Sequence, residues 1–318
     1  MRRILSCALL GIMTATCLLH AQSSDSTVAS LAGMSQRGQI QQVIDTANSL
    51  LSDARLTPAD QVLALIYLGY AHQQRGEFTQ ATANYEKALS VVDRDGQHPS
   101  EYAAALATLA TVYSQIGQID TAKRVLLRAE HLLEEQNDHA GAAMIWNDLA
   151  TIAAGQHSRG EAHKDMAHSI AESKLANNIS AGELATFATT EGRIAELDGD
   201  PRTALSDYDR ALDLWKQTNQ DQQQRTAWIY VLMGGAYLQA GDLANARESA
   251  ARGLSMLEAT SGRQTPRYLL AELTYSKILD ASGAHDEANK LRQEAQAGMN
   301  TGTDRQRAQG QISVNALR

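Results

Sequence analysis

Residues 65–89 decide the fold, and they read LIYLGYAHQQRGEFTQATANYEKAL. Apolar and small residues recur at helical spacing on both sides of Gly76, and they are Leu65, Leu68, Gly69, Phe78, Ala81, Tyr85 and Ala88. Because glycine commonly ends a helix, the pattern predicts two helices joined by a tight turn. One hairpin of this kind cannot bury its own apolar face, so the prediction requires further copies along the chain.

Further copies of the hairpin follow at a regular interval. Small residues equivalent to Ala81 recur after 41, 40, 42, 42 and 42 residues, as Ala122, Ala162, Ala204, Ala246 and Ala288. The turn glycine recurs as Gly117, Gly199, Gly241 and Gly283, and the small residue of each first helix recurs as Ala110, Ala150, Gly192, Gly234 and Ser276. Small residues at fixed places let neighbouring helices approach closely, so the repeats predict hairpins that stack into a solenoid.

The stretch 65–89 resembles the tetratricopeptide repeat, which has bulky, small and aromatic residues at the positions quoted above. It departs from the family pattern at His72, where the family prefers Tyr. The resemblance implies an all-α protein, a right-handed solenoid of about six to seven tetratricopeptide-type helical hairpins. The interval of 40 to 42 residues between the repeated alanines exceeds the usual 34 or so, and it is similar to a longer repeat type in that family.

The repeat register, together with the composition of the two ends, predicts four parts of the chain. They are a signal peptide over 1–21, a linker and incomplete capping hairpin over 22–58, a solenoid of six hairpins over 59–299, and a disordered tail over 300–318. Full hairpins are expected over 59–92, 100–136, 139–177, 180–218, 221–259 and 264–299. The last eight residues alternate apolar and polar side chains, which also suits a strand formed against a partner's edge.

The prolines agree with this register. Each falls where the first turn of a helix is expected, and they are Pro58, Pro99, Pro201 and Pro266. Proline costs nothing at that position because its missing N–H would have no helical partner. Thr57, Asp200 and Thr265 precede three of them as candidate N-caps.

The first 21 residues have the order of a secretory signal peptide, with Arg2 and Arg3, an apolar run over 4–19 and a polar stretch after Ala21. The apolar run is short for a membrane-spanning helix. We therefore expect cleavage after Ala21 and an exported chain, periplasmic or secreted, with no membrane association once the leader is removed. Two alternatives stay open: an uncleaved anchor, and a lipid attached at Cys17.

Charge and cysteine content narrow the functional classes. The chain has 28 Lys and Arg against 36 Asp and Glu, a net charge of −8, which disfavours a nucleic-acid partner. Both cysteines, Cys7 and Cys17, lie in the leader, so the mature chain would have no thiol chemistry.

No motif for catalysis, cofactor binding or metal binding stands out. The phosphate-binding loop, the nucleophile elbow and the His-Glu-x-x-His pattern do not occur. His163 and His168 are five residues apart, whereas metal sites on helices favour a separation of about four. We therefore expect no enzyme activity, no catalytic residues, no cofactor and no metal.

The third hairpin diverges most from the repeat pattern. His157 and Arg159 replace the turn glycine and the following aromatic residue, and Ser169 replaces a core alanine. An irregular turn is expected there. A hidden enzyme site in this hairpin, using His157 or His163, is an alternative to drift within one repeat.

The resemblance implies that a protein or peptide partner binds in a concave groove lined by the first helix of each hairpin. Carrying the family's groove positions onto this chain gives the candidates Tyr70, Gln73, Thr111, Ser114, Gln115, Asn147, Thr151, Thr189, Arg193, Glu196, Trp228, Val231, Gln239, Lys277 and Asp280. The lysine and asparagine clamp with which some members hold a C-terminal carboxylate is absent. Trp228 has a competing role as a packing residue between hairpins.

The residues thus favour a non-enzymatic scaffold that binds a protein or peptide outside the cytoplasm. A cytoplasmic or membrane-anchored adaptor or regulator with the same repeats is the main alternative, and it differs mainly in compartment.

Overall fold

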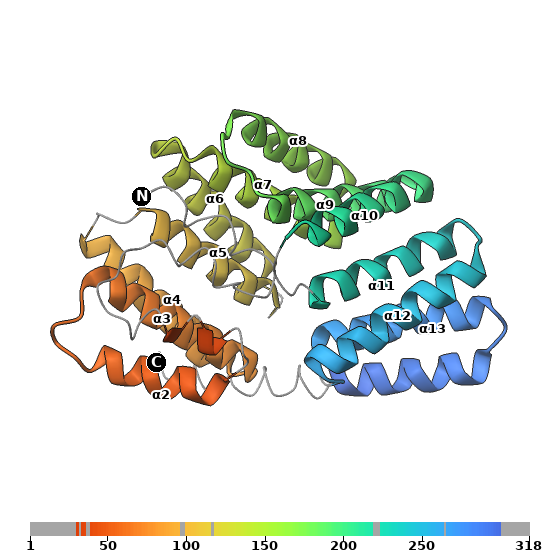
Figure 1. Cartoon of the computed structure of the whole chain (residues 1–318), viewed down its shortest axis with the longest axis horizontal. Coiled ribbons are helices and arrows are strands. Elements are labelled where there is room, and N and C mark those ends of the chain that lie inside the picture. The colour runs from red at the N-terminus through yellow and green to blue at the C-terminus, as the bar shows by residue number, and fades with distance from the viewer. Residues whose placement is uncertain are drawn as a thin grey trace. The chain divides into compact units, whose positions relative to one another are not determined.

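The computed structural model describes residues 30–31, 33–35, 39–95, 99–115, 118–218, 223–263 and 265–299 (Figure 1). Within these ranges the chain forms helices and no strand, so the expected all-α class is confirmed. The predicted signal peptide and the predicted C-terminal tail lie outside the described residues. No helix of the described ranges is long and apolar enough to cross a membrane.

The helices follow one another in antiparallel pairs, as the repeat pattern predicts. In chain order they are α2 (Ile40–Leu51), α3 (Pro58–Gln74), α4 (Phe78–Asp95), α5 (Pro99–Gln115), α6 (Ile119–Glu135), α7 (His139–Gly155), α8 (Arg159–Leu175), α9 (Ala181–Asp198), α10 (Pro201–Lys216), α11 (Gln223–Gln239), α12 (Leu243–Ser261) and α13 (Pro266–Ala281). Residues 285–299 are helical as well, and they follow α13 as the second helix of the last hairpin.

The chain divides into two compact units. The first contains the described residues up to Ile152 together with Lys164–Ile179, and the second contains Ala153–His163 and the described residues from Ser180 to Met299. Within each unit consecutive helices pack on one another, α2 to α6 in the first and α9 to α13 in the second. Each unit is thus a stack of hairpins of the kind that the fold class requires.

The first helices of the hairpins also contact one another along each stack. α3 contacts α5 in the first unit, and α11 contacts both α9 and α13 in the second. Contacts of similar extent between the second helices α4 and α6, or α10 and α12, are absent from the described residues. The side formed by first helices is therefore the closely spaced side of each unit, and we refer to it as the first-helix face.

The helix starts follow from the capping residues. α3, α10 and α13 each begin at a proline, as predicted. In each case the preceding side chain accepts a hydrogen bond from the amide three residues on, for example Thr57 from Asp60 at 3.2 Å. Ser180 and Glu183 form a reciprocal capping box at the start of α9.

The described turns between paired helices, which exclude the turn of the second hairpin, share one geometry. A glycine with positive φ follows the first helix in four hairpins, as Gly76, Gly199, Gly241 and Gly283. His157 takes this place in the third hairpin with φ 57, and its amide donates to the carbonyl three residues earlier at 3.1 Å, as in the first hairpin. The expected irregular turn is therefore wrong. A histidine adopts the left-handed conformation instead, at a cost of about 1 kcal/mol.

The repeated alanines form the centre of the stacks. Ala81, Ala122, Ala162, Ala204, Ala246 and Ala288 all have 0% exposure. Ser169, in place of a core alanine, is also buried, and its hydroxyl donates to the carbonyl of Ala143 at 2.8 Å. The repeat register read from the alanines therefore matches the packing.

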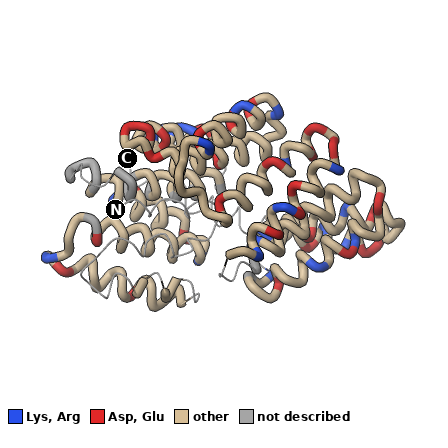
Figure 2. Tube along the Cα trace, turned by 45° about the horizontal axis from the view of Figure 1, so that its top comes forward, with Lys and Arg blue, Asp and Glu red and all other residues tan. Residues whose placement is uncertain are grey.

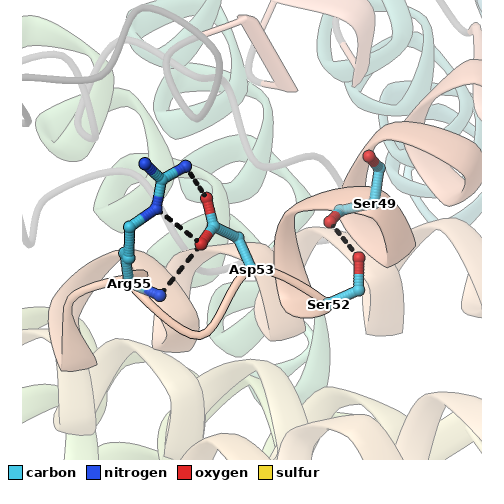
Figure 3. A network of polar contacts seen from close by, with 4 residues as sticks. All are labelled: Ser49, Ser52, Asp53 and Arg55. Carbon is cyan, nitrogen blue, oxygen red and sulfur yellow. Dashed lines mark hydrogen bonds and ion pairs between the residues drawn. The ribbon is translucent and has the colours of Figure 1, made fainter.

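The turn between α2 and α3 is held by an exposed ion pair (Figure 3). The backbone amide and the guanidinium of Arg55 both donate to the Asp53 carboxylate, at 2.9 to 3.1 Å. These hydrogen bonds lower the pKa of Asp53 to about 2. The Ser52 hydroxyl donates to the Ser49 carbonyl at 2.6 Å and closes the last turn of α2.

Candidate functional site

The first-helix face of the second unit brings together three of the predicted groove residues, Arg193, Glu196 and Gln239. The Tyr208 hydroxyl donates to Glu196 Oε2 at 2.8 Å, and Gln239 Nε2 donates to the Glu196 carbonyl oxygen at 3.1 Å. A Cβ at Gly235 would lie 3.3 Å from Glu196 Oε1, so the carboxyl group lies against α11. We call Arg193, Glu196, Tyr208 and Gln239 the polar cluster.

Packing of the Tyr208 ring inside the hairpin fixes the position of the Tyr208 hydroxyl. Tyr208 is fully buried, and its ring lies against Gly192, where an added Cβ would come within 2.5 Å of Cε1. Only glycine leaves room for the ring at this distance. The α10 tyrosine therefore reaches through the hairpin to the first-helix face, where it meets Glu196.

The electrostatics of the polar cluster depend on burial. Burial raises the pKa of Glu196 to about 7, although the Tyr208 hydrogen bond and the positive charge of Arg193 both oppose this rise. Burial, the Glu196 charge and the hydrogen bond to Glu196 together raise the pKa of Tyr208 well above its usual range. The cluster thus holds a carboxyl group that changes charge near neutral pH.

A second group of side chains lies at the start of α11 and α13. The guanidinium carbon of Arg225 is 4.8 Å from the centroid of the Trp215 ring, and that of Arg267 is 5.7 Å from the Trp228 ring. Burial, together with the positive charge of Arg267, lowers the pKa of Arg225 to about 10, and burial also lowers the pKa of Arg267. We call Trp215, Arg225, Trp228 and Arg267 the arginine–tryptophan cluster.

Trp228 has the packing role that the sequence allowed, and its role as a binding residue stays a prediction. Its ring is partly buried and packs against a core group that includes Val231, Leu257 and Tyr268, while Arg267 covers the ring. The other members, Trp215 and the two arginines, were not predicted from the sequence. An arginine near the first turn of two consecutive first helices was the signal that could have pointed to them.

The remaining predicted positions of the second unit are dispersed. The Thr189 hydroxyl is bonded to the Ala185 carbonyl at 2.8 Å, and Val231 is buried. Lys277 and Asp280 are exposed on α13, and Asp280 pairs with His285 at 2.7 Å. They lie on the first helix of the last hairpin, outside both clusters.

In the first unit the predicted positions are mostly buried. Tyr70 and Gln73 are 7% and 8% exposed, and the Gln73 Oε1 atom accepts a hydrogen bond from the Tyr85 hydroxyl at 3.1 Å. Asn147 is fully buried, and its side-chain amide has no hydrogen-bond partner among the described residues. Thr151 is partly buried near the end of α7.

Of the predicted positions on α5, the Thr111 hydroxyl is bonded to the Ala107 carbonyl at 3.2 Å, and Ser114 is partly buried. The side chain of Gln115 lies outside the described residues.

The divergent third hairpin contributes an ion-pair group to the second unit. His163 Nε2 lies 2.9 Å from Asp198 Oδ2, and Arg159 Nε lies 3.1 Å from Asp198 Oδ1. Arg159 also donates to the Leu197 carbonyl. His157 is exposed in its turn. Over the described ranges, no group of three or more His, Cys, Asp or Glu side chains could hold a metal ion.

Two segments of the chain, residues 60–135 and 183–259, match the family model described as "Tetratricopeptide repeat". Among curated proteins, no sequence relative matches the chain. The matched segments contain the hairpins α3–α4 and α5–α6 of the first unit, and most of α9 to α12 of the second.

Solved structures show the same architecture. A tetratricopeptide repeat protein from Parabacteroides merdae is 14% identical with a TM-score of 0.53, over 87% of this chain and 93% of that chain. The apo form of RapI is 11% identical with a TM-score of 0.63, over 86% and 98%. NprR, solved with its cognate peptide NprX, is 13% identical with a TM-score of 0.62, over 92% and 86%. The chain therefore carries tetratricopeptide repeats over two segments and has the helical-repeat fold of these proteins.

Proposed function

We propose that the chain is a non-enzymatic scaffold that binds a protein or peptide partner on its first-helix face, outside the cytoplasm. The observation that carries this proposal is the polar cluster. It places a guanidinium, a carboxyl group and an exposed amide on the closely spaced side of the second unit. The Gln239 amide donates to the Glu196 carbonyl oxygen, and the Arg193 charge acts on the Glu196 carboxyl group.

The groups of the polar cluster suit recognition of a polypeptide. An amide and a carboxyl group can hydrogen-bond the main chain of a bound peptide, and Arg193 can pair with its carboxylates. NprR, whose fold this chain shares, was solved with a peptide bound. That precedent supports a peptide or protein partner for this chain.

The proposed compartment rests on the leader. The order of charges and apolar residues over 1–21, and the placement of both cysteines inside that stretch, support export and removal of the leader. N-terminal sequencing of protein recovered from cells checks this. A mature chain that begins at Gln22 supports the proposal, and a chain that retains Met1 would favour the cytoplasmic or anchored alternative.

The binding role is tested with a random peptide library displayed on phage and selected on the mature chain. Peptides should be enriched, and Arg193→Ala or Gln239→Ala should weaken their binding at least tenfold with little change in the denaturant midpoint. The matched control is Arg247→Ala, at an exposed position on α12, which should bind as the unaltered chain does. Equal binding by all three variants would refute the first-helix face as the binding surface.

A further inference from the structure

Two arginines in the second unit are held near each other, although both are positively charged. Arg225 lies in the first turn of α11, and Arg267 is the second residue of α13, a helix that contacts α11. Each guanidinium is stacked over a tryptophan ring, which fixes its position. The arginine–tryptophan cluster therefore presents two cationic groups from neighbouring first helices.

Burial and mutual repulsion disfavour the charged forms of the two arginines. The two charges repel each other, and partial burial removes water that would otherwise screen them. Among the described residues Arg267 makes no hydrogen bond or ion pair, and its guanidinium lies over the Trp228 ring. The positive ends of the α11 and α13 dipoles lie at the same place and add to the repulsion. An anion bound between the arginines would offset these effects.

The whole chain argues against a large polyanion as that ligand. Its net charge is −8, and Figure 2 shows acidic residues interspersed with basic ones along the helices. Such a surface repels nucleic acid but allows a single acidic group to reach a local cationic site. The partly buried Trp228 ring packs against buried apolar residues of α13, including Tyr268 and Leu269, which hold it in place beside Arg267.

We propose that Arg225 and Arg267 bind a carboxylate side chain of an acidic peptide partner, with the Trp215 and Trp228 rings holding the two guanidiniums in place. The inference rests on the proposed function, because it names the chemistry of the partner. Arg267 supplies a guanidinium with open hydrogen-bonding capacity, and Arg225 supplies the second positive charge.

The test uses peptides from the library selection described above. Peptides enriched on the mature chain should contain Asp or Glu, and replacing that residue by its amide should weaken binding at least tenfold. Arg267→Gln should weaken binding of the acidic peptide at least tenfold and leave binding of the amide peptide unchanged. Arg247→Gln, on the exposed surface of α12, serves as the matched control and should change neither.

Stability provides a second readout that separates a binding residue from a structural one. Removal of one of two repelling charges should leave the denaturant midpoint of Arg267→Gln unchanged or raise it. A lowered midpoint, or unaltered affinity of this variant for the acidic peptide, would overturn the proposal. Inorganic phosphate should displace the acidic peptide no better than chloride at equal ionic strength, and stronger displacement would assign the site to free oxyanions instead.

The two proposals fail in different ways. Peptides that depend on Arg193 and Gln239 but carry no acidic residue, and that bind Arg267→Gln normally, would overturn the carboxylate site and keep the scaffold. Absence of any enriched peptide would count against both proposals.

Discussion

The hairpins α3–α4 and α9–α10 belong to different units, yet they have the same internal packing. An added Cβ at Gly69 would lie 2.5 Å from Cε1 of Tyr85, and one at Gly192 would lie 2.5 Å from Cε1 of Tyr208. Both tyrosines are fully buried. The hairpin interior is therefore repeated with the same side-chain geometry.

The two hairpins differ at the residue that each tyrosine hydroxyl meets. Tyr85 donates to Gln73 at 3.1 Å, whereas Tyr208 donates to Glu196 at 2.8 Å. The first partner is neutral, and the second ionises near neutral pH. The repeat thus preserves its packing contacts while the polar group on the first-helix face changes from hairpin to hairpin.

The largest effect is expected from substitutions that remove the packing shared by the two hairpins. Tyr85→Ala and Tyr208→Ala should each lower the free energy of unfolding by about 3–5 kcal/mol, because each removes a buried aromatic ring and leaves a cavity. Denaturant unfolding, followed by circular dichroism, measures both losses. If one substitution costs less than about 1 kcal/mol, the two hairpins are not equivalent.

The second prediction sharpens the difference between Gln73 and Glu196. Burial raises the pKa of Glu196 from 4.5 to about 7, so the folded state binds this proton more tightly than the unfolded state does. The stability associated with the proton is present below about pH 4.5 and is lost as pH rises to about 7. Glu196→Gln should therefore raise the free energy of unfolding by about 3 kcal/mol at about pH 8, and by much less at about pH 4.

The reciprocal substitution is the control for that prediction. Gln73→Glu places a carboxyl group beside the Tyr85 hydroxyl in the first hairpin, at a position that is 8% exposed. It should introduce a loss of stability between about pH 4.5 and pH 8 that the unaltered first hairpin lacks. An unfolding profile that is independent of pH in both variants would show that burial of the carboxyl group is less costly than the account requires.

A smaller effect is expected from a single methyl group at the close contact. Gly69→Ala and Gly192→Ala should each lower the free energy of unfolding by about 1–3 kcal/mol, because the new Cβ would overlap the tyrosine ring. Alanine at Gly160, where the added Cβ meets no atom within 4 Å, is the matched control and should be neutral or stabilising. Neutral results at all three positions would contradict the close packing.

The smallest effect concerns the hydroxyl groups alone. Tyr85→Phe and Tyr208→Phe should each cost about 1 kcal/mol, since each removes one hydrogen bond and keeps the ring. Tyr208→Phe should also raise the pKa of Glu196, because the hydrogen bond from Tyr208 now lowers it. Carboxyl NMR chemical shifts of Glu196 against pH measure this change, and a lowered pKa in the variant would disprove the role of the hydrogen bond.

The repeated small residues were sufficient to predict the hairpins. The two helices of each hairpin pack closely at the same point, and a small buried residue is needed there in every repeat. The prolines located helix starts for a similarly local reason. The turn at His157 was predicted wrongly because the sequence shows only that the turn glycine is missing. It does not show that the flanking helices can hold a histidine in the left-handed conformation. The packing of the flanking helices imposes the turn geometry at this position, and the sequence pattern does not describe that packing.

The polar groups were predicted less completely. Arg193, Glu196 and Gln239 were placed on the first-helix face by resemblance, but their connection through Glu196 depends on how α9 packs on α10 and α11. Contacts such as that between Gln239 and Glu196 join residues far apart in the chain, and no local pattern encodes them. Arg225 and Arg267 were missed for the same reason, since their proximity follows from the packing of α13 on α11.

The most direct test of the first-helix face as the binding surface is hydrogen–deuterium exchange of the mature chain, with and without a peptide from the library selection. The account predicts slower amide exchange confined to α9, α11 and α13 when the peptide is bound, with α10 and α12 unchanged. Slower exchange on α10 and α12, with the first helices unaffected, would contradict it.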